Sequence, residues 1–230
     1  MRLAERHIIK STEPRFAPID ALAFQSKNLY NAANYVIRQN FVYGWGYLNY
    51  HKMAQLMKSH PAYQALPAKV SQQILMILDQ NWQAFFEAVK AYKTEPTKFT
   101  GRPKLPKYKD KIKGRNILIY TIQAISSKEL KKGIIQLSGT NILIKTQVKP
   151  DQICQVRLVP KCDSYVIEVI YNEPESPLDE NPKESVASID LGLNNLVALT
   201  SNQPGFVPLL INGRPLKSIN QFYNKRKAQL

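Results

Sequence analysis

Apolar residues recur at helical spacing in the first 93 residues of the chain. Between residues 20 and 43 they follow one another mostly at three- and four-residue steps, on a single helical face: Leu22, Leu29, Ala33, Val36, Ile37 and Phe41. Asp20 is the expected N-cap of this helix, and Gly44 and Gly46 end it. The pattern therefore predicts a helix over residues 20–43.

Two further helices are expected before residue 94. A short one covers 49–58 and ends before Pro61, and Pro67 is placed to open a longer one that keeps an apolar face to about residue 93. The aromatic residues of this part either pack in a core or stack on nucleobases, and their positions on the apolar faces favour the core. Residues 11–115 are thus expected to form a helical bundle that ends in a basic segment.

The hydrophobic period changes to two after residue 115. Short β-rich runs follow, separated by turn-forming residues: 116–122, 133–139, 140–148, 153–159 and 164–171. One more strand is expected over residues 2–10. The six strands suit a small antiparallel β-barrel made of residues 1–10 and 116–175, with the helical bundle inserted between its first and second strands. The expected fold class is α+β.

A second group of strands is expected near the C-terminal end. Residues 176–185 are acidic and contain proline, which is typical of a linker. The elements expected in residues 186–230 are a strand ending on Asp190, strands over 196–201 and 206–211, and a helix from about Ser218. Together they predict a three-stranded antiparallel meander that begins a second domain.

Positive charge is concentrated in one part of the chain. There are 32 Lys and Arg residues against 17 Asp and Glu, a formal net charge of +15. Residues 90–115 alone hold ten basic and two acidic residues, which is more than half of the excess. Such a patch favours a polyanionic partner, because neutralising phosphates releases their condensed counterions.

The basic segment, residues 94–115, breaks the helical pattern with three prolines and two glycines. A solvated linker is one interpretation of this composition. Leu105, Tyr108 and Ile112 alternate with the cations, however, which favours an ordered loop that follows phosphates. The candidate nucleic-acid-binding residues are Arg102, Lys104, Lys107, Tyr108, Lys109, Lys111, Lys113 and Arg115.

The remaining residues disfavour several classes of protein. No apolar run approaches the roughly 20 residues that span a bilayer, and residues 1–10 are not followed by the apolar region of a secretion signal. Cys154 and Cys162 lack the CxxC spacing of a zinc site, and the three histidines are scattered. We expect a cytoplasmic protein without zinc and without a membrane partner.

Asp190 is the candidate for chemistry, and it is the last acidic residue of the chain. One interpretation is a turn residue before Gly192. The other is a metal ligand, because phosphodiester cleavage with divalent ions needs rigidly held carboxylates and a strand holds one better than a loop does. The residues by themselves leave both interpretations open.

Four stretches resemble, in order along the chain, the OrfB/TnpB family of transposon-encoded RNA-guided nucleases, which are related to type V CRISPR effectors. SIDLGLNNLVALTS (188–201) resembles the first RuvC motif of that family, and GRPKLPKYKDK (101–111) is similar to its basic stretch. Residues 156–171 look like the strand pair before its linker, and residues 211–230 like the segment that opens its next helix.

This resemblance implies a domain order and an activity. Residues 1–10 and 116–175 would form a wedge-type barrel, 11–115 a helical recognition insertion, and 186–230 the first strands of a ribonuclease-H-like RuvC domain. The implied activity is that of a DNA endonuclease, also called a transposase, with a guide RNA and a target DNA as partners. Mg²⁺ is the implied cofactor, and Asp190 takes the role of its first ligand.

The family pattern is incomplete after Asp190. It includes a later glutamate, a further aspartate and a four-cysteine zinc ribbon, whereas residues 191–230 contain no Asp, Glu or Cys. One carboxylate binds Mg²⁺ poorly, so we expect a truncated family member that does not hold Mg²⁺ stably and does not cleave alone. A separately encoded C-terminal half is a candidate partner.

The alternative is a nuclease-dead RNA- or DNA-binding module that acts by occupancy, as a repressor does. In either case residues 186–230 are expected to be less stable than the rest, because three strands alone bury little surface and leave an open edge.

Overall fold

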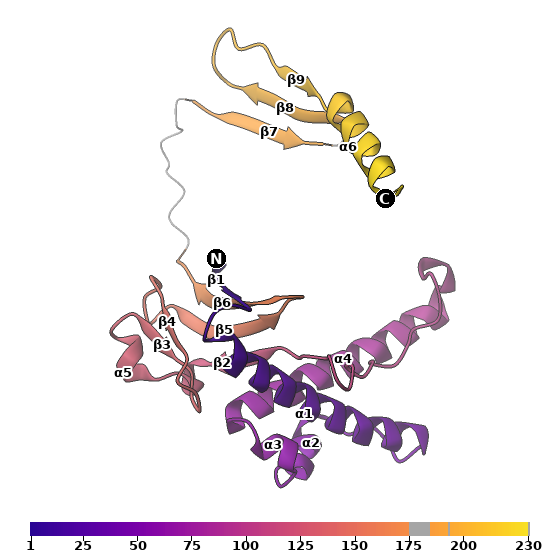
Figure 1. Ribbon diagram of the computed structural model, residues 1–230. Helices are drawn as coiled ribbons and strands as arrows, with labels where there is room; N and C mark the ends of the chain where they lie inside the picture. The colour runs from indigo at the N-terminus through magenta and orange to yellow at the C-terminus, as the bar shows by residue number, and fades with distance from the viewer. Residues whose placement is uncertain (175–184, 193, 230) are drawn as a thin grey trace. The chain divides into compact units, whose positions relative to one another are not determined.

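The computed structural model describes residues 1–174, 185–192 and 194–229, and the chain divides into two compact units, Met1–Pro174 and Glu175–Leu230. Each unit has its own antiparallel sheet (Figure 1). The expected linker, 176–185, lies outside the described residues except for Ser185. The mixture of helices and antiparallel strands confirms the expected α+β class.

The first unit is built on a four-stranded antiparallel sheet with the order β1-β6-β5-β2. Its strands are β1 (Arg2–Lys10), β2 (Leu118–Thr121), β5 (Ile153–Pro160) and β6 (Ser164–Asn172). The N-terminal strand pairs along its whole length with β6, from Arg2 opposite Asn172 to Lys10 opposite Ser164. Because side chains alternate between the faces of a strand, the period-two pattern buries every second residue through much of β5 and β6.

The expected β-barrel is wrong in one respect, because the described strands do not close. β3 (Ile134–Gln136) and β4 (Leu143–Lys145) form a separate two-stranded ladder, joined to the preceding segment by the single bridge between Ile125 and Leu137. The short helices η2 (Ile122–Ala124) and α5 (Ser127–Leu130) interrupt the chain after β2. Barrel closure requires a continuous hydrogen-bonded register around the sheet, and strands of three residues do not supply one.

The helical bundle comprises α1 (Phe16–Val42), α2 (Tyr50–Met57), α3 (Pro61–Gln64) and α4 (Ala68–Thr94), followed by the short helix η1 (Pro96–Lys98). The expected helices are present, but α1 begins four residues before Asp20 and the residue at its N-cap is Arg15. Asp20 is therefore not a cap. Gly44 does end the first helical segment, with a left-handed φ of 73° that an L side chain rarely adopts.

Bundle and sheet share one hydrophobic core. The buried cluster contains Ile19 and Leu29 of α1, Leu78 of α4, Leu118 of β2 and Ile167 of β6. In Figure 1, α1 and α4 lie side by side next to this sheet. The helices are thus an integral layer of the first unit, because their apolar faces are covered partly by strands that precede and follow them in the sequence.

The second unit is a three-stranded meander with one helix. Its elements are β7 (Ala187–Leu191), β8 (Asn195–Ser201), β9 (Leu209–Asn212) and α6 (Arg214–Lys227), with the strand order β7-β8-β9. The helix begins four residues before the expected Ser218, with Pro215 in its first turn, where the missing amide proton costs nothing.

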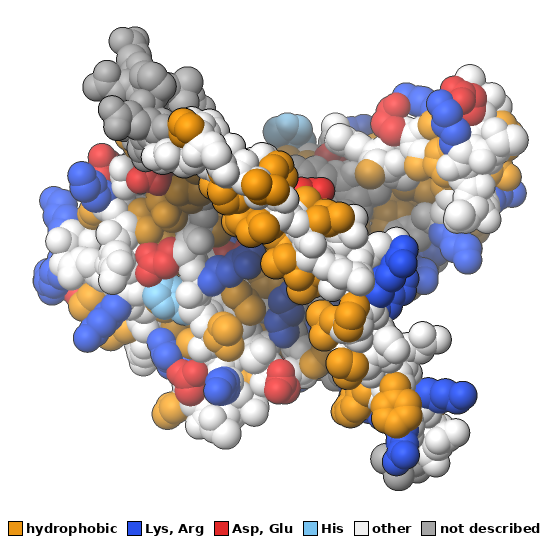
Figure 2. Space-filling view, turned by 90° about the horizontal axis from the view of Figure 1, so that it is seen from above, with side chains coloured by type: hydrophobic (Ala, Val, Ile, Leu, Met, Phe, Trp, Pro, Cys, Tyr) orange, Lys and Arg blue, Asp and Glu red, His pale blue; other side chains and the backbone are white. Residues whose placement is uncertain are grey.

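Apolar side chains of the second unit are exposed on both faces of its sheet. Ile189 is 62% exposed on one face, and Leu210, which shares the other face with Asp190, is 66% exposed. Among the described residues of this unit only Gly213 is buried. Figure 2 shows hydrophobic side chains gathered along this sheet. The described residues of this unit therefore form no internal core of the kind that stabilises the first unit.

The search of the described residues for a helix long and apolar enough to cross a membrane finds none.

Candidate nucleic-acid interface

A row of polar residues along one side of α1 holds the basic segment. The row is formed by Asp20, Lys27, Asn31 and Asn34, which are separated by seven, four and three residues and so fall on one helical face. Lys27 and Asn34 are buried although they are polar. Buried polar groups of this kind require partners, and each of these residues finds its partner in the basic segment.

Asn31 and Asn34 bind the middle of the segment through its backbone. The Asn31 amide donates to the carbonyl of Lys109 at 2.9 Å and its oxygen accepts the Lys109 N–H at 2.9 Å. The Asn34 amide donates to the carbonyl of Pro106 at 3.1 Å, while its oxygen accepts from the buried Trp82 indole at 3.0 Å. The side chains of α1 therefore satisfy backbone groups that a free loop would present to water.

Lys27 binds the next part of the segment. The residue is almost fully buried, and its ammonium lies 3.6 Å from the centre of the Phe24 ring and donates to the carbonyl of Lys111 at 2.7 Å. Burial lowers the pKa of Lys27, and the nearby Arg115 lowers it further. A buried ammonium bound to a carbonyl fixes the backbone at this point, but it does not itself present a charge to a ligand.

Asp20 holds the C-terminal end of the segment. Both of its oxygens accept from the Arg115 guanidinium, at 2.7 and 2.6 Å, and one also accepts from the Tyr165 hydroxyl of β6 at 2.7 Å. The Arg115 hydrogen bonds hold the pKa of Asp20 below its usual value. Burial, followed by the bond to Asp20, raises the pKa of Tyr165. Of the candidate cations, Arg115 is thus the one whose charge is already paired.

A tight turn closes the segment before Arg115. One oxygen of Asp110 accepts the N–H groups of Ile112 and Lys113 at 2.9 and 2.6 Å, and these bonds lower its pKa. A side chain on Gly114 would place its Cβ 2.3 Å from the Asp110 carbonyl oxygen, closer than a Cβ atom comes to an oxygen to which it is not bonded. Glycine is therefore required at this position by space.

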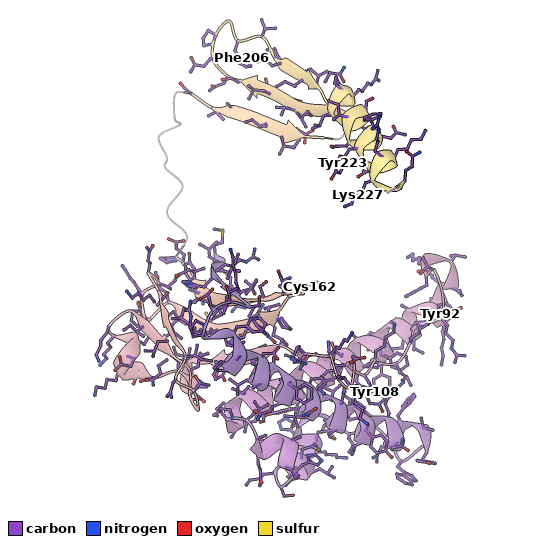
Figure 3. The ribbon with its side chains drawn as sticks, viewed as in Figure 1. Tyr92, Tyr108, Cys162, Phe206, Tyr223 and Lys227 are labelled. Carbon is purple, nitrogen blue, oxygen red and sulfur yellow. The ribbon has the colours of Figure 1, made fainter. Side chains whose placement is uncertain are left out.

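Apart from Lys98, which pairs with Glu95 at 2.6 Å, the remaining cations of the segment are exposed and unpaired among the described residues. The backbone bonds described above leave their side chains free, and none of them forms an ion pair within the described part of the chain: Arg102, Lys104, Lys107, Lys109, Lys111 and Lys113. Lys109 lies 5.5 Å from the Tyr30 ring centre, and Arg38 of α1 lies 4.8 Å from the ring of Tyr108. In Figure 3, Tyr108 lies over the helices, between the far end of α4, marked by Tyr92, and the sheet.

These cations border a polar hollow on the first unit. A cavity of about 590 Å³ is bounded by Tyr30 of α1, Asn81 of α4 and the lysines at positions 104, 107 and 109 of the segment. Three ammonium groups on a backbone that α1 already holds in place form a surface suited to successive phosphates. Little conformational entropy of the backbone is lost on binding, because the backbone is ordered beforehand.

Asp190 lies in β7 opposite Ala198 of β8, with its side chain exposed. It is therefore a strand residue, and the turn interpretation is wrong. The described residues contain no group of three or more His, Cys, Asp or Glu side chains that could hold a metal ion. Mg²⁺ keeps its hydration waters unless several charged oxygens converge, so the described residues around Asp190 do not form a site that fits the ion.

Sequence reasoning identified the basic segment but missed the residues that hold it. The sequence pattern predicts a helix cap at Asp20 and does not distinguish Lys27, Asn31 and Asn34 from other polar residues of the helix. A signal was present, because these polar residues recur at helical spacing beside an apolar face. Helical spacing alone does not say whether such a row faces water or another segment.

Comparisons with known proteins give solved structures only. No family model matches the chain, and no curated protein matches it. The chain is similar to a chain of the Cas12f1-sgRNA-target DNA complex, with 12% identity and a TM-score of 0.38, over 99% of this chain and 62% of that one. It is also similar to a chain of a CRISPR-Cas12f ternary complex, with 12% identity and a TM-score of 0.37, over 93% of this chain and 52% of that one.

Proposed function

We propose that this chain binds nucleic acid through the basic segment mounted on α1. The observation that carries the proposal is the row of six exposed, unpaired cations between Arg102 and Lys113 on a backbone fixed by Lys27, Asn31 and Asn34. Phosphate contacts supply most of the affinity in non-specific binding, and exposed Lys and Arg side chains make them. A solvated linker would not have its backbone groups bound at three places by one helix.

The class of nucleic acid follows from the family resemblance. The four stretches that resemble OrfB/TnpB proteins support a guide RNA and a target DNA as the partners. In this proposal residues 11–115 act as the recognition part and 186–230 as the start of a RuvC-type domain, and Asp190 is a metal ligand that acts only together with carboxylates from elsewhere. The placement of Asp190 in the first strand of an antiparallel meander supports its role.

The salt dependence of binding tests the role of the segment. Lys104, Lys107 and Lys109 are replaced together by Gln, and binding to a single-stranded oligonucleotide is followed at several salt concentrations. The slope of log K against log salt is negative, and its magnitude should decrease by about 2 to 3, since each lost phosphate contact removes about 0.7 to 0.9. The matched control replaces Lys128, Lys131 and Lys149, three exposed lysines elsewhere in the same unit, and should keep most of the slope. Equal slopes for the two triple variants would refute the assignment.

Cleavage is tested separately from binding. Asp190→Ala should leave the affinity for nucleic acid within about twofold of the unaltered chain, because Asp190 is not part of the basic segment. Mg²⁺-dependent cleavage by the chain alone is not expected from one exposed carboxylate. If binding occurs without cleavage, the chain acts as an occupancy-based binding module under those conditions. Cleavage that persists in Asp190→Ala would overturn the role given to this residue.

A further inference from the structure

A second cavity lies at the N-terminal end of the row of cations. It has a volume of about 930 Å³, opens to solvent and is bounded by Phe41, Tyr47, Phe85 and Phe86, with Arg102 on its border. Phe85 borders both this cavity and the polar hollow formed by the lysines. The two cavities are thus adjacent along the basic segment. The larger one is lined mainly by aromatic rings, and the smaller one is lined by three lysines.

The aromatic residues of this cavity are fixed from below but incompletely covered. Trp82 is fully buried, and its ring centre lies 5.8 Å from that of Phe86 and 5.9 Å from that of Phe85. Phe85 and Phe86 are themselves only half-buried, and Phe41 is 40% exposed. Rings that are immobilised by a core and still accessible lose little entropy when a flat ligand stacks on them.

The charge at this cavity favours a ligand with phosphates. Lys90 on its border is paired with Glu87 at 2.7 Å, so its charge is largely compensated. Arg102 forms no ion pair within the described residues. A planar guanidinium both stacks on aromatic rings and binds phosphate oxygens. An apolar protein segment would use the rings but would leave this cation without a partner.

We propose that this cavity receives an unpaired nucleobase of a single strand whose phosphates lie along Lys104, Lys107 and Lys109. The inference rests on the proposed nucleic-acid binding and adds that the segment prefers single-stranded nucleic acid with bases over a bare sugar–phosphate chain. Stacking on aromatic side chains is tolerant of sequence, because every base has an aromatic face. A paired base inside a duplex is not available for such a cavity without unstacking.

The test compares two probes that carry the same phosphates. One is a single-stranded oligothymidylate of about 16 nucleotides, and the other has abasic sugars in place of its thymidines. The full chain should bind the first about tenfold more tightly than the second. Phe86→Leu should reduce this preference to about twofold and leave the affinity for the abasic strand unchanged, because leucine keeps the apolar contact with the core and loses the ring.

Two further variants sharpen the test. Arg102→Lys keeps the charge and loses the planar group, so it should lower the preference for bases about threefold, because binding of the oligothymidylate weakens more than binding of the abasic strand. This residue is exposed, so its replacement does not threaten folding. Tyr92→Leu, on the same helix α4 but outside the cavity, is the matched control and should keep the full preference.

Each outcome decides between separate claims. Equal affinity of the unaltered chain for both probes would refute the nucleobase cavity and leave the proposed phosphate binding intact. No affinity for either probe would refute both.

Tyr43 and Trp45 are an alternative site on which bases could stack. They form an exposed stacked pair with ring centres 5.1 Å apart. If Trp45→Leu abolishes the preference and Phe86→Leu does not, the bases stack there and the cavity is not their site.

Discussion

Asp20 accepts three hydrogen bonds from two residues that are distant in the sequence, Arg115 and Tyr165. One carboxylate thereby joins α1, the C-terminal end of the basic segment and strand β6 of the first sheet. Asp20 neutralises Arg115, whereas the six cations from Arg102 to Lys113 form no ion pair among the described residues. At the scale of single residues, Asp20 and Gly114 determine where the segment ends.

The charge of Asp20 makes part of the folding stability depend on pH. Because the pKa of Asp20 is lowered below 3.8 in the folded protein, its contribution is present above the unfolded value and is lost as the pH falls through the folded value. Asp20→Asn should destabilise the first unit by about 1–3 kcal/mol at neutral pH. It should also flatten the decrease in stability below about pH 4.

Chemical denaturation between pH 2 and pH 7 measures both effects. Asp151→Asn is a matched control, because Asp151 is exposed and forms no ion pair within the described part of the chain. A parallel loss of stability in Asp20→Asn and Asp151→Asn at low pH would contradict the role of Asp20.

Gly114 offers a second test at the residue scale. Gly114→Ala forces a Cβ against the backbone of Asp110, and relief of the contact has to open the turn. We expect a destabilisation of about 1–3 kcal/mol and weaker nucleic-acid binding, because Lys111 and Lys113 move with the turn. Gly101→Ala, in the same segment with nothing within 4 Å, should leave the melting temperature and the affinity unchanged. Thermal unfolding and oligonucleotide titration of the pair distinguish a steric effect from a general effect of alanine.

At the scale of elements, the two sheets differ in how much they bury. The strands β5 and β6 belong to the core that also contains α1 and α4, whereas β7, β8 and β9 expose apolar side chains on both faces within their unit. Strands without a covered face are held mainly by backbone hydrogen bonds, which contribute little when water competes for them.

Hydrogen exchange should therefore separate the two sheets. Amides of β8, the central strand of the meander, should exchange roughly 100-fold faster than those of β5, because the free energy of local opening follows the buried apolar surface. β8 gives the fair comparison, since it is paired on both sides, as β5 is. Equal protection of β5 and β8 in the full chain would contradict this prediction and would indicate that something covers the meander.

At the scale of the whole molecule, the helical bundle and the first sheet form one cooperative unit, since a single cluster of buried residues extends from Ile9 to Val169. Leu78→Ala, a fully buried change in α4, should cost about 2–5 kcal/mol and lower the protection of amides in β5 and β6 together with those of α4. Loss of protection confined to the helices would show that the bundle unfolds as a separate domain. Leu143→Ala, at an exposed position of β4, is the control and should change little.

The sequence by itself determined the elements and the charge. Periods of three to four and of two residues located the helices and strands, because burial of one face repeats at the same interval as the backbone geometry. The concentration of cations in residues 90–115 and the strand character around Asp190 were also visible, since both are local properties. Helix starts were less certain, as α1 and α6 show, because proline and uncapped residues are accepted in a first turn.

Only the tertiary structure decided what the cations are attached to and whether the strands close. The bonds that fix the basic segment join residues 72 to 95 positions apart, and no local pattern records such pairs. No local pattern records the cavity formed by Phe41, Phe86 and Arg102 either. Nor does a local pattern show that the short strands β3 and β4 fail to close the sheet into a barrel. Local periodicity reports which face of an element is buried, whereas the partner that buries it is set by packing over the whole chain.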